Sequence, residues 1–410
     1  KGGWYPFLEF NNIIARFSLN WLTVSFKEWE CMLSILSNGI LSVTLGNIIM
    51  MLVALGLIYL AIAKKYEPAL LVPIGFSTIL ANIPLSSAVD QFIDGVLHKG
   101  VLNVFFDVGI VTEIFPLLIF IAVGAMIDFG PLLENPVMFL FGAAAQFGIF
   151  ATVIVATMLG FDIKQAASIG IIGAADGPTS IYVASRFAKE LLGPISVAAY
   201  SYMSLVPIIQ PPVIKALTTK EERMIKMESK SVKITKTMRI VFPIAVTIVA
   251  SLLAPSSAAL IGFLMFGNLL RECGVLNGLA KSAQNELANL VTILLGLSIG
   301  STMTADKFLR PQTLMIIVLG LVAFILDTAG GVLFAKFLNL FLKKKMNPML
   351  GAAGISAFPM SARVIHILGR KEDPTNYLLM HAIGANVAGQ IGSVLAGGIL
   401  VALVSSLGGM

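Results

Sequence analysis

The chain has 410 residues, of which 57% are hydrophobic and only 12% are charged. Soluble domains carry about 25% charged residues, so this composition excludes a soluble enzyme and indicates a helical protein that crosses a membrane many times. The net charge of +6 is expected to come from loops facing anionic lipid, and no nucleic-acid partner is predicted. Two cysteines and three histidines are too few and too scattered to predict a disulfide framework or a metal cluster.

Residues 1–42 mix Trp4, Trp21 and Trp29 with charged side chains. This pattern predicts an interfacial N-terminal segment, because indole rings favour the level of the lipid headgroups. Ten long apolar runs follow, and most are long enough to cross about 30 Å of hydrocarbon. The predicted spans are 43–63, 68–88, 108–128, 137–160, 193–214, 239–255, 257–271, 286–304, 312–342 and 376–405.

Two further apolar stretches, 165–190 and 347–370, are interrupted by Gly and Pro. We predict that each forms a re-entrant hairpin, which enters the membrane and leaves on the same side. With the hairpins counted this way, the basic clusters at 64–65, 215–239 and 343–345 fall on one side of the membrane. The positive-inside rule makes that side cytoplasmic. The predicted fold class is therefore an all-α polytopic membrane protein with two opposed hairpins.

The sequence also contains a weak internal repeat. The stretch 124–136 resembles 300–311, and each is followed by a long span and then a hairpin. The two copies run in opposite directions, which predicts an inverted repeat of the kind found in transporters. The predicted organisation is an interfacial segment 1–42, scaffold helices 43–107, a first repeat 108–214, a basic cytoplasmic loop with scaffold helices 215–285, and a second repeat 286–410.

Asp176 is the strongest candidate site residue, because it places a carboxylate in an apolar region directly before Gly177 and Pro178. A charge in hydrocarbon costs roughly 2.5–3.5 kcal/mol on insertion scales, and Gly-Pro breaks a helix at that point. Broken backbone at membrane depth persists only where protein buries it or water lines it. The hydroxyls and free carbonyls of Pro178-Thr179-Ser180 suit a small hard cation such as Na⁺. The alternative is a carboxyl group that only supports the hairpin.

Other polar residues lie in or beside the hairpins. Tyr202 follows Tyr200 and Ser201 in the next span, where a phenol can serve an ion path or simply bond between helices. In the second hairpin Asn347, Gly351 and Ser356 precede Arg363. The guanidinium of Arg363 can pair with Asp176, bind a carboxylate substrate, or extend to the headgroups.

Asn386 lies on a helix face of small residues and can ligate an ion or bond across helices. Asp327 ranks below Asp176, because no Gly-Pro break adjoins it.

The stretches 176–186 and 198–212, together with Tyr66-Glu67-Pro68 and the residues up to Gly75, resemble the β subunit of sodium-pumping, biotin-dependent decarboxylases. That family includes the oxaloacetate, methylmalonyl-CoA, glutaconyl-CoA and malonate enzymes, and the similarity covers nearly the whole chain from about residue 40. The resemblance implies a membrane subunit that decarboxylates carboxybiotin, consumes a proton and exports Na⁺.

The resemblance also implies roles for single residues. Asp176 resembles the essential Na⁺-site aspartate, with Tyr202, Asn347, Gly351, Ser356 and Asn386 along the Na⁺ path. We assign Arg363 to carboxybiotin, because a guanidinium matches a carboxylate, and we assign Ser356 and Tyr202 to the exchange of Na⁺ and protons.

The partners implied by the resemblance are a carboxyltransferase subunit, a biotin carrier protein or domain, and a small membrane-anchored subunit. An oligomer, with a trimer as the candidate state, in the bacterial cytoplasmic membrane is also implied. Lys226-Met227 resembles a biotin attachment site but lies in a charged loop, so no covalent biotin is expected on this chain. The alternative function is a stand-alone secondary transporter for Na⁺ and protons, or for Na⁺ and an organic anion.

Overall fold

The computed structural model describes residues 38–93, 95–227 and 233–407. Within these ranges the regular secondary structure is helical, apart from one short antiparallel hairpin of β1 (Gln91–Ile93) and β2 (Val96–His98), in which Phe92 pairs with Leu97. The prediction of an all-α membrane protein is confirmed. Most of the predicted interfacial segment 1–42, with its three tryptophans, lies outside the described residues.

Six helical runs are long and apolar enough to cross a membrane. They are α3 (Leu45–Lys64), α8 with α9 (Met138–Ala144 and Phe147–Met158), η3 with α12 (Lys189–Leu191 and Leu192–Leu217), α14 (Lys236–Leu253), α19 (Pro311–Leu338) and α22 (Leu379–Leu407). A seventh run is broken at Thr112–Glu113, where α5 (Val101–Phe105) with η1 (Phe106–Val111) meets α6 (Ile114–Met126) at 63°. Glu113 has a positive φ of 64° at this break, so the predicted span 108–128 is not straight.

Several predicted spans form shorter helices. Run 68–88 becomes α4 (Pro68–Asn82) and ends before Pro84, and run 257–271 becomes α15 (Ala258–Glu272). Run 286–304 contains α17 (Ala288–Gly300), which continues α16 (Asn277–Ser282) and the π-helical turn η5 (Ala283–Leu287). The remaining short helices are α7 (Gly130–Glu134), α13 (Lys220–Arg223), η4 (Pro255–Ser257) and α18 (Ala305–Phe308).

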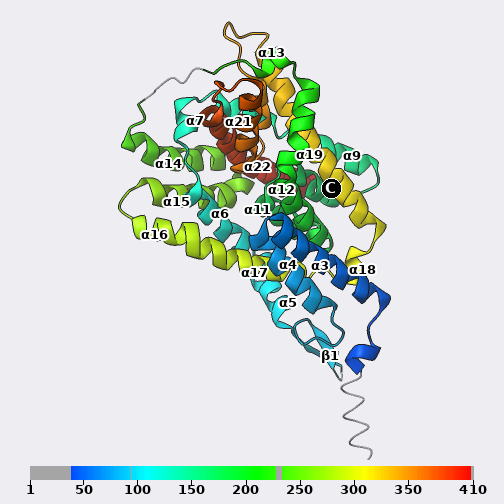
Figure 1. Cartoon of the computed structure of the whole chain (residues 1–410). Helices are drawn as coiled ribbons and strands as arrows, with labels where there is room; N and C mark the ends of the chain where they lie inside the picture. The colour runs from blue at the N-terminus through cyan, green and yellow to red at the C-terminus, as the bar shows by residue number, and fades with distance from the viewer. Residues whose placement is uncertain (1–37, 94, 228–232, 408–410) are drawn as a thin grey trace, which may run out of the picture.

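Both predicted hairpins are broken helices. The first consists of α10 (Ile163–Gly170) with η2 (Ile171–Ala174), then α11 (Gly177–Phe187); the second consists of α20 (Met349–Ala352) and α21 (Met360–Glu372). At 1.5 Å per residue, no arm approaches the roughly 30 Å of a bilayer core. The hairpins pack against α12, α19 and α22 in the centre of the bundle, while α14 and α15 extend to one side and α3 to α5 lie at one end (Figure 1).

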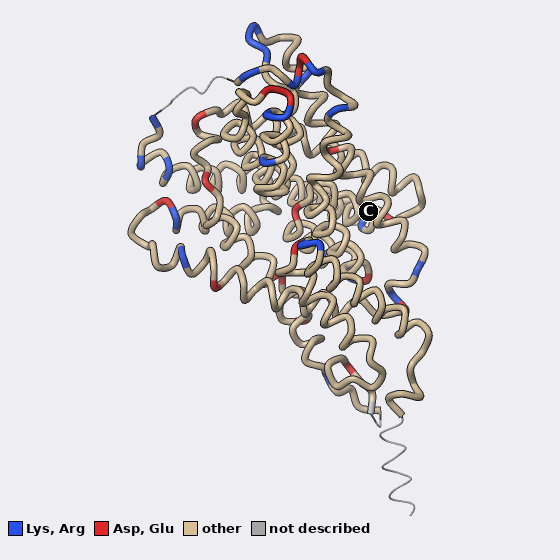
Figure 2. Tube along the Cα trace, viewed as in Figure 1, with Lys and Arg blue, Asp and Glu red and all other residues tan. Residues whose placement is uncertain are grey.

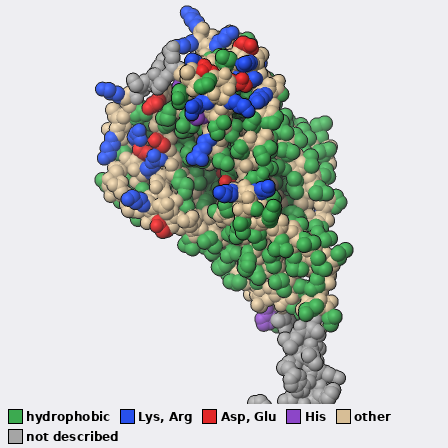
Figure 3. Space-filling model, in the orientation of Figure 1, with side chains coloured by type: hydrophobic (Ala, Val, Ile, Leu, Met, Phe, Trp, Pro, Cys, Tyr) green, Lys and Arg blue, Asp and Glu red, His purple; other side chains and the backbone are tan. Residues whose placement is uncertain are grey.

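Charged and apolar surfaces separate along the molecule. Lys and Arg gather at the end that carries α13, and the region of α3 to α5 is largely uncharged (Figure 2). Hydrophobic side chains cover most of the same face below that charged end (Figure 3). On α14, Leu252 and Leu253 are 78% and 82% exposed, which suits a helix surrounded by lipid rather than by water.

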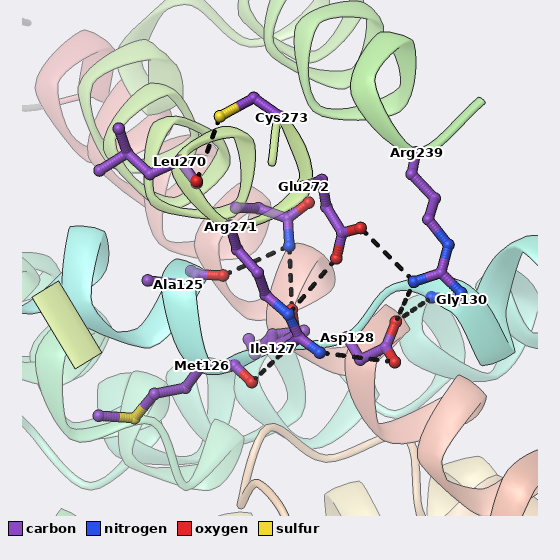
Figure 4. Close-up of polar contacts among 12 residues, drawn as sticks. Ala125, Met126, Ile127, Asp128, Gly130, Arg239, Leu270, Arg271, Glu272 and Cys273 are labelled. Atoms are coloured by element: carbon purple, nitrogen blue, oxygen red, sulfur yellow. Dashed lines mark hydrogen bonds and ion pairs between the residues drawn. The ribbon is translucent and has the colours of Figure 1, made fainter. Parts of the chain in front are cut away.

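A cluster of four charges holds the ends of α6, α14 and α15 together (Figure 4). Arg239 lies 3.6 Å from Asp128 and 3.5 Å from Glu272, and Arg271 contacts the same two carboxylates at 3.6 and 3.4 Å. Arg271 also donates to the carbonyl of Met126 at 2.9 Å. The last turn of α6 therefore has a fixed position next to the cavity that Met126 helps to line.

Two glycines allow α6 and α15 to pack backbone against backbone. A Cβ atom on Gly124 would lie 1.8 Å from the carbonyl oxygen of Leu264, and a Cβ on Gly267 would lie 2.0 Å from that of Ile121. Small residues permit this close approach between helices in a membrane.

We predict that Gly267→Ala destabilises the protein by about 1–3 kcal/mol, because the new methyl group must push the two helices apart. Gly262→Ala on the same helix is the matched control, since its Cβ would lie 3.9 Å from the nearest atom, in Thr247. The midpoint of thermal unfolding in detergent should fall for Gly267→Ala and stay level or rise slightly for Gly262→Ala. Equal midpoints would contradict the close packing.

Candidate functional site

The first helix break presents Asp176 as a buried acceptor. Ala175 follows η2 in the left-handed region with φ of 50°, Asp176 is extended, and Gly177 and Pro178 are the first two residues of α11. The carboxylate is 4% exposed, and its Oδ2 accepts hydrogen bonds from Thr179 Oγ1 at 2.6 Å and from Ser393 Oγ at 2.7 Å. No salt bridge to Asp176 occurs among the described residues, so its described partners are neutral hydrogen-bond donors.

The second helix break lies against the first. The amide of Ser356 donates to the carbonyl of Ala174 at 3.0 Å, which joins the tips of the two hairpins through their backbones. The Ser356 hydroxyl donates to the carbonyl of Gly389 at 2.8 Å. Gln390 Nε2 donates to the Ser356 carbonyl, and Asn386 Nδ2 donates to that of Ile355 at 2.5 Å. One face of α22 thus satisfies the backbone groups that the second break leaves free.

A cavity of about 270 Å³ lies between the breaks. Its polar lining includes Asp176, Tyr200, Ser356, Gln390 and Glu67, and its remaining wall is mostly apolar. These side chains offer mainly oxygen atoms, which hard cations prefer. Among the described residues no group of three or more His, Cys, Asp or Glu side chains could hold a metal ion. The donor set is one of carboxylate, hydroxyl and carbonyl groups at broken helices, which suits a monovalent cation.

Asn386 contributes a buried acceptor beside this cavity. Its side chain is 0% exposed, and Oδ1 has no hydrogen-bond partner in the described structure. A buried acceptor left unpaired costs about 1–3 kcal/mol. An ion or a water molecule at this position would remove that cost.

Tyr202 lies outside the cavity, on the opposite side of α12 from Tyr200. Its hydroxyl donates to the carbonyl of Ile317 on α19, whereas the ring of Tyr200 packs over Gly177, where a Cβ would lie 2.1 Å from the ring. Residues two positions apart on a helix point about 200° apart, so only one of the two tyrosines can face Asp176. The structure places Tyr200 there.

Asn347 and Gly351 lie along the second hairpin, away from its tip. Asn347 Nδ2 donates to the carbonyls of Arg223 at 2.9 Å and Ile225 at 2.8 Å, and its Oδ1 accepts from the amide of Met349. A Cβ on Gly351 would lie 1.9 Å from the carbonyl oxygen of Gly331. Asn347 therefore fastens the basic loop to the hairpin, and Gly351 lets the hairpin approach α19.

Arg363 is exposed on α21, and it makes no described contact with Asp176. The possibility that the two form an ion pair is therefore not supported, which leaves the guanidinium available to a ligand. Asp327 lies behind the first hairpin, where its Oδ1 accepts from the amide of Ile149 at 3.1 Å and its Oδ2 has no partner in the described structure. Asp327, on α19, thus accepts a hydrogen bond from an amide in the first turn of α9, which that helix cannot satisfy itself.

Of the seven predicted site residues, Asp176 and Ser356 line the cavity, and Asn386 bonds to the second helix break at Ile355. The other four, Tyr202, Asn347, Gly351 and Arg363, do not line this cavity. The sequence reasoning did not identify Ser393, Gln390 or Glu67. For two of these a signal was present, because Gln390 and Ser393 follow Asn386 by four and seven residues and so share its helix face.

Comparison with known proteins adds to this geometry. The model of the family "Na+-transporting oxaloacetate decarboxylase beta subunit" matches residues 46–404. The chain belongs to this family. The resemblance seen in the sequence is confirmed, and the chain is a β subunit of the sodium-transporting decarboxylase family.

Three relatives illustrate the range of the family. The chain is 51% identical over 385 residues to methylmalonyl-CoA decarboxylase subunit beta of Propionigenium modestum, covering 90% of this chain and 97% of the relative. It is 54% identical over 367 residues to glutaconyl-CoA decarboxylase subunit beta of Acidaminococcus fermentans, covering 90% and 96%. It is 48% identical over 433 residues to a probable oxaloacetate decarboxylase beta chain of Pasteurella multocida, covering 92% and 100%. Relatives named for three different substrates are thus about equally similar.

We predict that Asn347→Ala loosens the basic loop, because the carbonyls of Arg223 and Ile225 then keep only the longer bonds from Asn376, at 3.2 and 3.3 Å. Limited proteolysis should cut near residues 223–227 faster than in the unchanged protein. Asn285→Ala is the control, since that exposed amide bonds only within its own helix. A Na⁺ requirement that changes while proteolysis does not would place Asn347 on the ion path instead.

Proposed function

We propose that this β subunit decarboxylates carboxybiotin, consumes a proton and couples the reaction to Na⁺ export. The observation that carries the proposal is the meeting of two broken helices beside Asp176, a buried carboxylate that accepts hydrogen bonds from two hydroxyl groups and has no counter-ion among the described residues. In transporters, broken helices of this kind coordinate ions near the middle of the membrane. Membership in a sodium-transporting family supports Na⁺ as the cargo.

The Na⁺ ligands in this proposal are the carboxylate of Asp176, the hydroxyl of Ser356 and the free Oδ1 of Asn386. Thr179 and Ser393 orient the carboxylate by donating to its Oδ2.

Tyr202, Asn347 and Gly351 act from outside the cavity, by holding α12 and the second hairpin against α19 and the basic loop. Na⁺ and a proton compete for the same oxygens, so the arrival of one releases the other.

Carboxybiotin is supplied by a partner, and we place its carboxylate at Arg363. A guanidinium offers two parallel donors to a carboxylate, and α21 leaves this one exposed. Loss of CO₂ breaks the bond between the carboxylate carbon and the ureido nitrogen of biotin. A proton then takes the vacated position on that nitrogen, and we assign its delivery to the cavity side of the path, at the Ser356 hydroxyl.

Movement in this proposal involves the two hairpins together. The hydrogen bond from Ser356 to Ala174 links their tips, and the predicted inverted repeat would place them on opposite sides of the membrane. A joint rocking motion would then expose the cavity first to one side and then to the other.

The proposed assembly follows from membership in a multi-subunit family. It comprises a carboxyltransferase subunit, a biotin carrier protein or domain and a small membrane-anchored subunit. This subunit forms an oligomer in the bacterial inner membrane, with a trimer as the candidate state. Because relatives named for three substrates are similarly close, we propose a carboxylic acid or acyl-CoA as the substrate of the partner and no narrower choice.

Asp176→Asn in the purified membrane complex tests the proposed ion site. With free carboxybiotin as substrate, CO₂ release by the unchanged complex should depend on Na⁺, and the variant should lose that dependence together with most of its activity, because an amide cannot balance the charge of the ion. Asp306→Asn, at an exposed position, is the control and should behave as the unchanged complex does.

Two results would favour a stand-alone secondary transporter. One is an intact complex that does not turn over carboxybiotin in either the presence or the absence of Na⁺. The other is Na⁺ movement that continues when avidin blocks biotin, since a carrier does not need a biotinylated partner.

A second prediction concerns Arg363→Lys. The ammonium group retains the charge but not the paired donors, so KM for carboxybiotin should rise about tenfold, the effect expected when one of two charge-assisted hydrogen bonds is lost. The Na⁺ concentration for half-maximal activity should stay unchanged. Arg370→Lys is the control on the same helix, where Arg370 stacks on Tyr377. Normal carboxybiotin kinetics in Arg363→Lys would remove Arg363 from the reaction.

A further inference from the structure

Glu67 brings a second carboxylate to the cavity that contains Asp176. It occupies the tight turn between α3 and α4, more than 100 positions earlier in the chain than Asp176, and it lines the same cavity. Tyr200 also lines this cavity, and its hydroxyl group interacts electrostatically with both carboxylates.

The backbone at Glu67 is held in an unusual conformation. Its φ of 35° and ψ of 60° lie in the left-handed region, which residues other than Gly rarely adopt. Pro68 follows as the first residue of α4, and a proline restricts the residue before it. Strained backbone of this kind persists where the surroundings determine it and is concentrated at ligand sites. At Glu67 the left-handed backbone conformation occurs in a residue whose side chain lines the cavity.

The carboxylate of Glu67 has no partner in the described structure. No hydrogen bond or ion pair joins it to another residue there, although Lys64 and Lys65 lie three and two positions before it. It is partly buried, and this burial raises the pKa of the carboxyl above its ordinary value, as expected when water is removed and no counter-ion replaces it. A cation in the cavity would supply the missing partner.

We propose that Glu67 is a second Na⁺-binding carboxylate, which holds the ion at the mouth of the cavity before or after it occupies the Asp176 site. The inference rests on the proposed function, since it needs Na⁺ to pass Asp176. Asp176 is almost fully buried, whereas Glu67 is only partly so, and this difference orders the two sites from the cavity mouth inward. The paired lysines beside Glu67 favour release of the ion, because like charges close to the site weaken its hold.

The test is E67Q in the intact complex, with free carboxybiotin as substrate and Na⁺ varied. The Na⁺ concentration for half-maximal activity should rise about three- to tenfold, the effect of one carboxylate on a nearby monovalent cation in a partly solvated site. The maximal rate should fall much less. E221Q is the matched control, because Glu221 is an exposed glutamate on α13, and it should leave both quantities unchanged.

E67G separates the charge from the backbone conformation. Glycine adopts the left-handed region without strain, so the turn is kept while the carboxylate is removed. The same weakening of Na⁺ in E67G and E67Q supports a binding carboxylate, and E67G carries the test if E67Q does not assemble. Na⁺ should also raise the thermal midpoint of the unchanged complex at lower concentrations than it does for E67Q.

Three results are distinguishable. If the unchanged complex shows no dependence on Na⁺, the proposed function itself fails. If it depends on Na⁺ and E67Q and E67G respond as it does, the proposed function stands and the second site is wrong. A shift that disappears in concentrated choline chloride also overturns the site, because screening abolishes attraction at a distance but not direct ligation.

Discussion

The hydrogen bond between the Ser356 amide and the Ala174 carbonyl is the contact on which the central architecture depends. A helix that is broken inside a membrane exposes amides and carbonyls that no water can satisfy, and each costs several kcal/mol if left alone. Here an amide at the second break donates to a carbonyl at the first, so one unpaired group on each side finds its partner. Because the two hairpins come from distant parts of the chain, the same bond also fixes where Asp176 lies relative to Ser356.

Helix α22 supports this junction from one side. Asn386, Gln390 and Ser393 lie on one face and reach, in order, the Ile355 carbonyl, the Ser356 carbonyl and the Asp176 carboxylate. Gly389 lies on the same helix, and a Cβ there would be 2.1 Å from the carbonyl oxygen of Gly354. A single helix thus combines close packing with the polar groups that both breaks require, so the proposed ion site and the junction cannot be altered independently.

Local chemistry made some of this site predictable. Asp176-Gly177-Pro178 is a charge beside a helix breaker, and the resemblance to a known family points to Ser356 and Asn386. The remaining features depend on contacts between distant segments. Because α12 is buried around much of its circumference, hydrophobic periodicity cannot tell whether Tyr200 or Tyr202 faces the cavity. Likewise, nothing near Glu67 in the sequence shows that its turn lines the same cavity as Asp176. The sequence alone also cannot show that Asn347 bonds to the basic loop.

Helix α12 carries Pro207, Pro211 and Pro212, and each removes an amide donor from the helical ladder. Before these prolines, Tyr200 lines the cavity, while among them Gln210 donates to the Ala352 carbonyl and accepts from Ser361 in the second hairpin. The segment between Tyr200 and Gln210 therefore resists bending less than an intact helix does. The prolines therefore give α12 a hinge. A tilt of the second hairpin, which holds Gln210, would bend the helix there and displace the ring of Tyr200 only slightly.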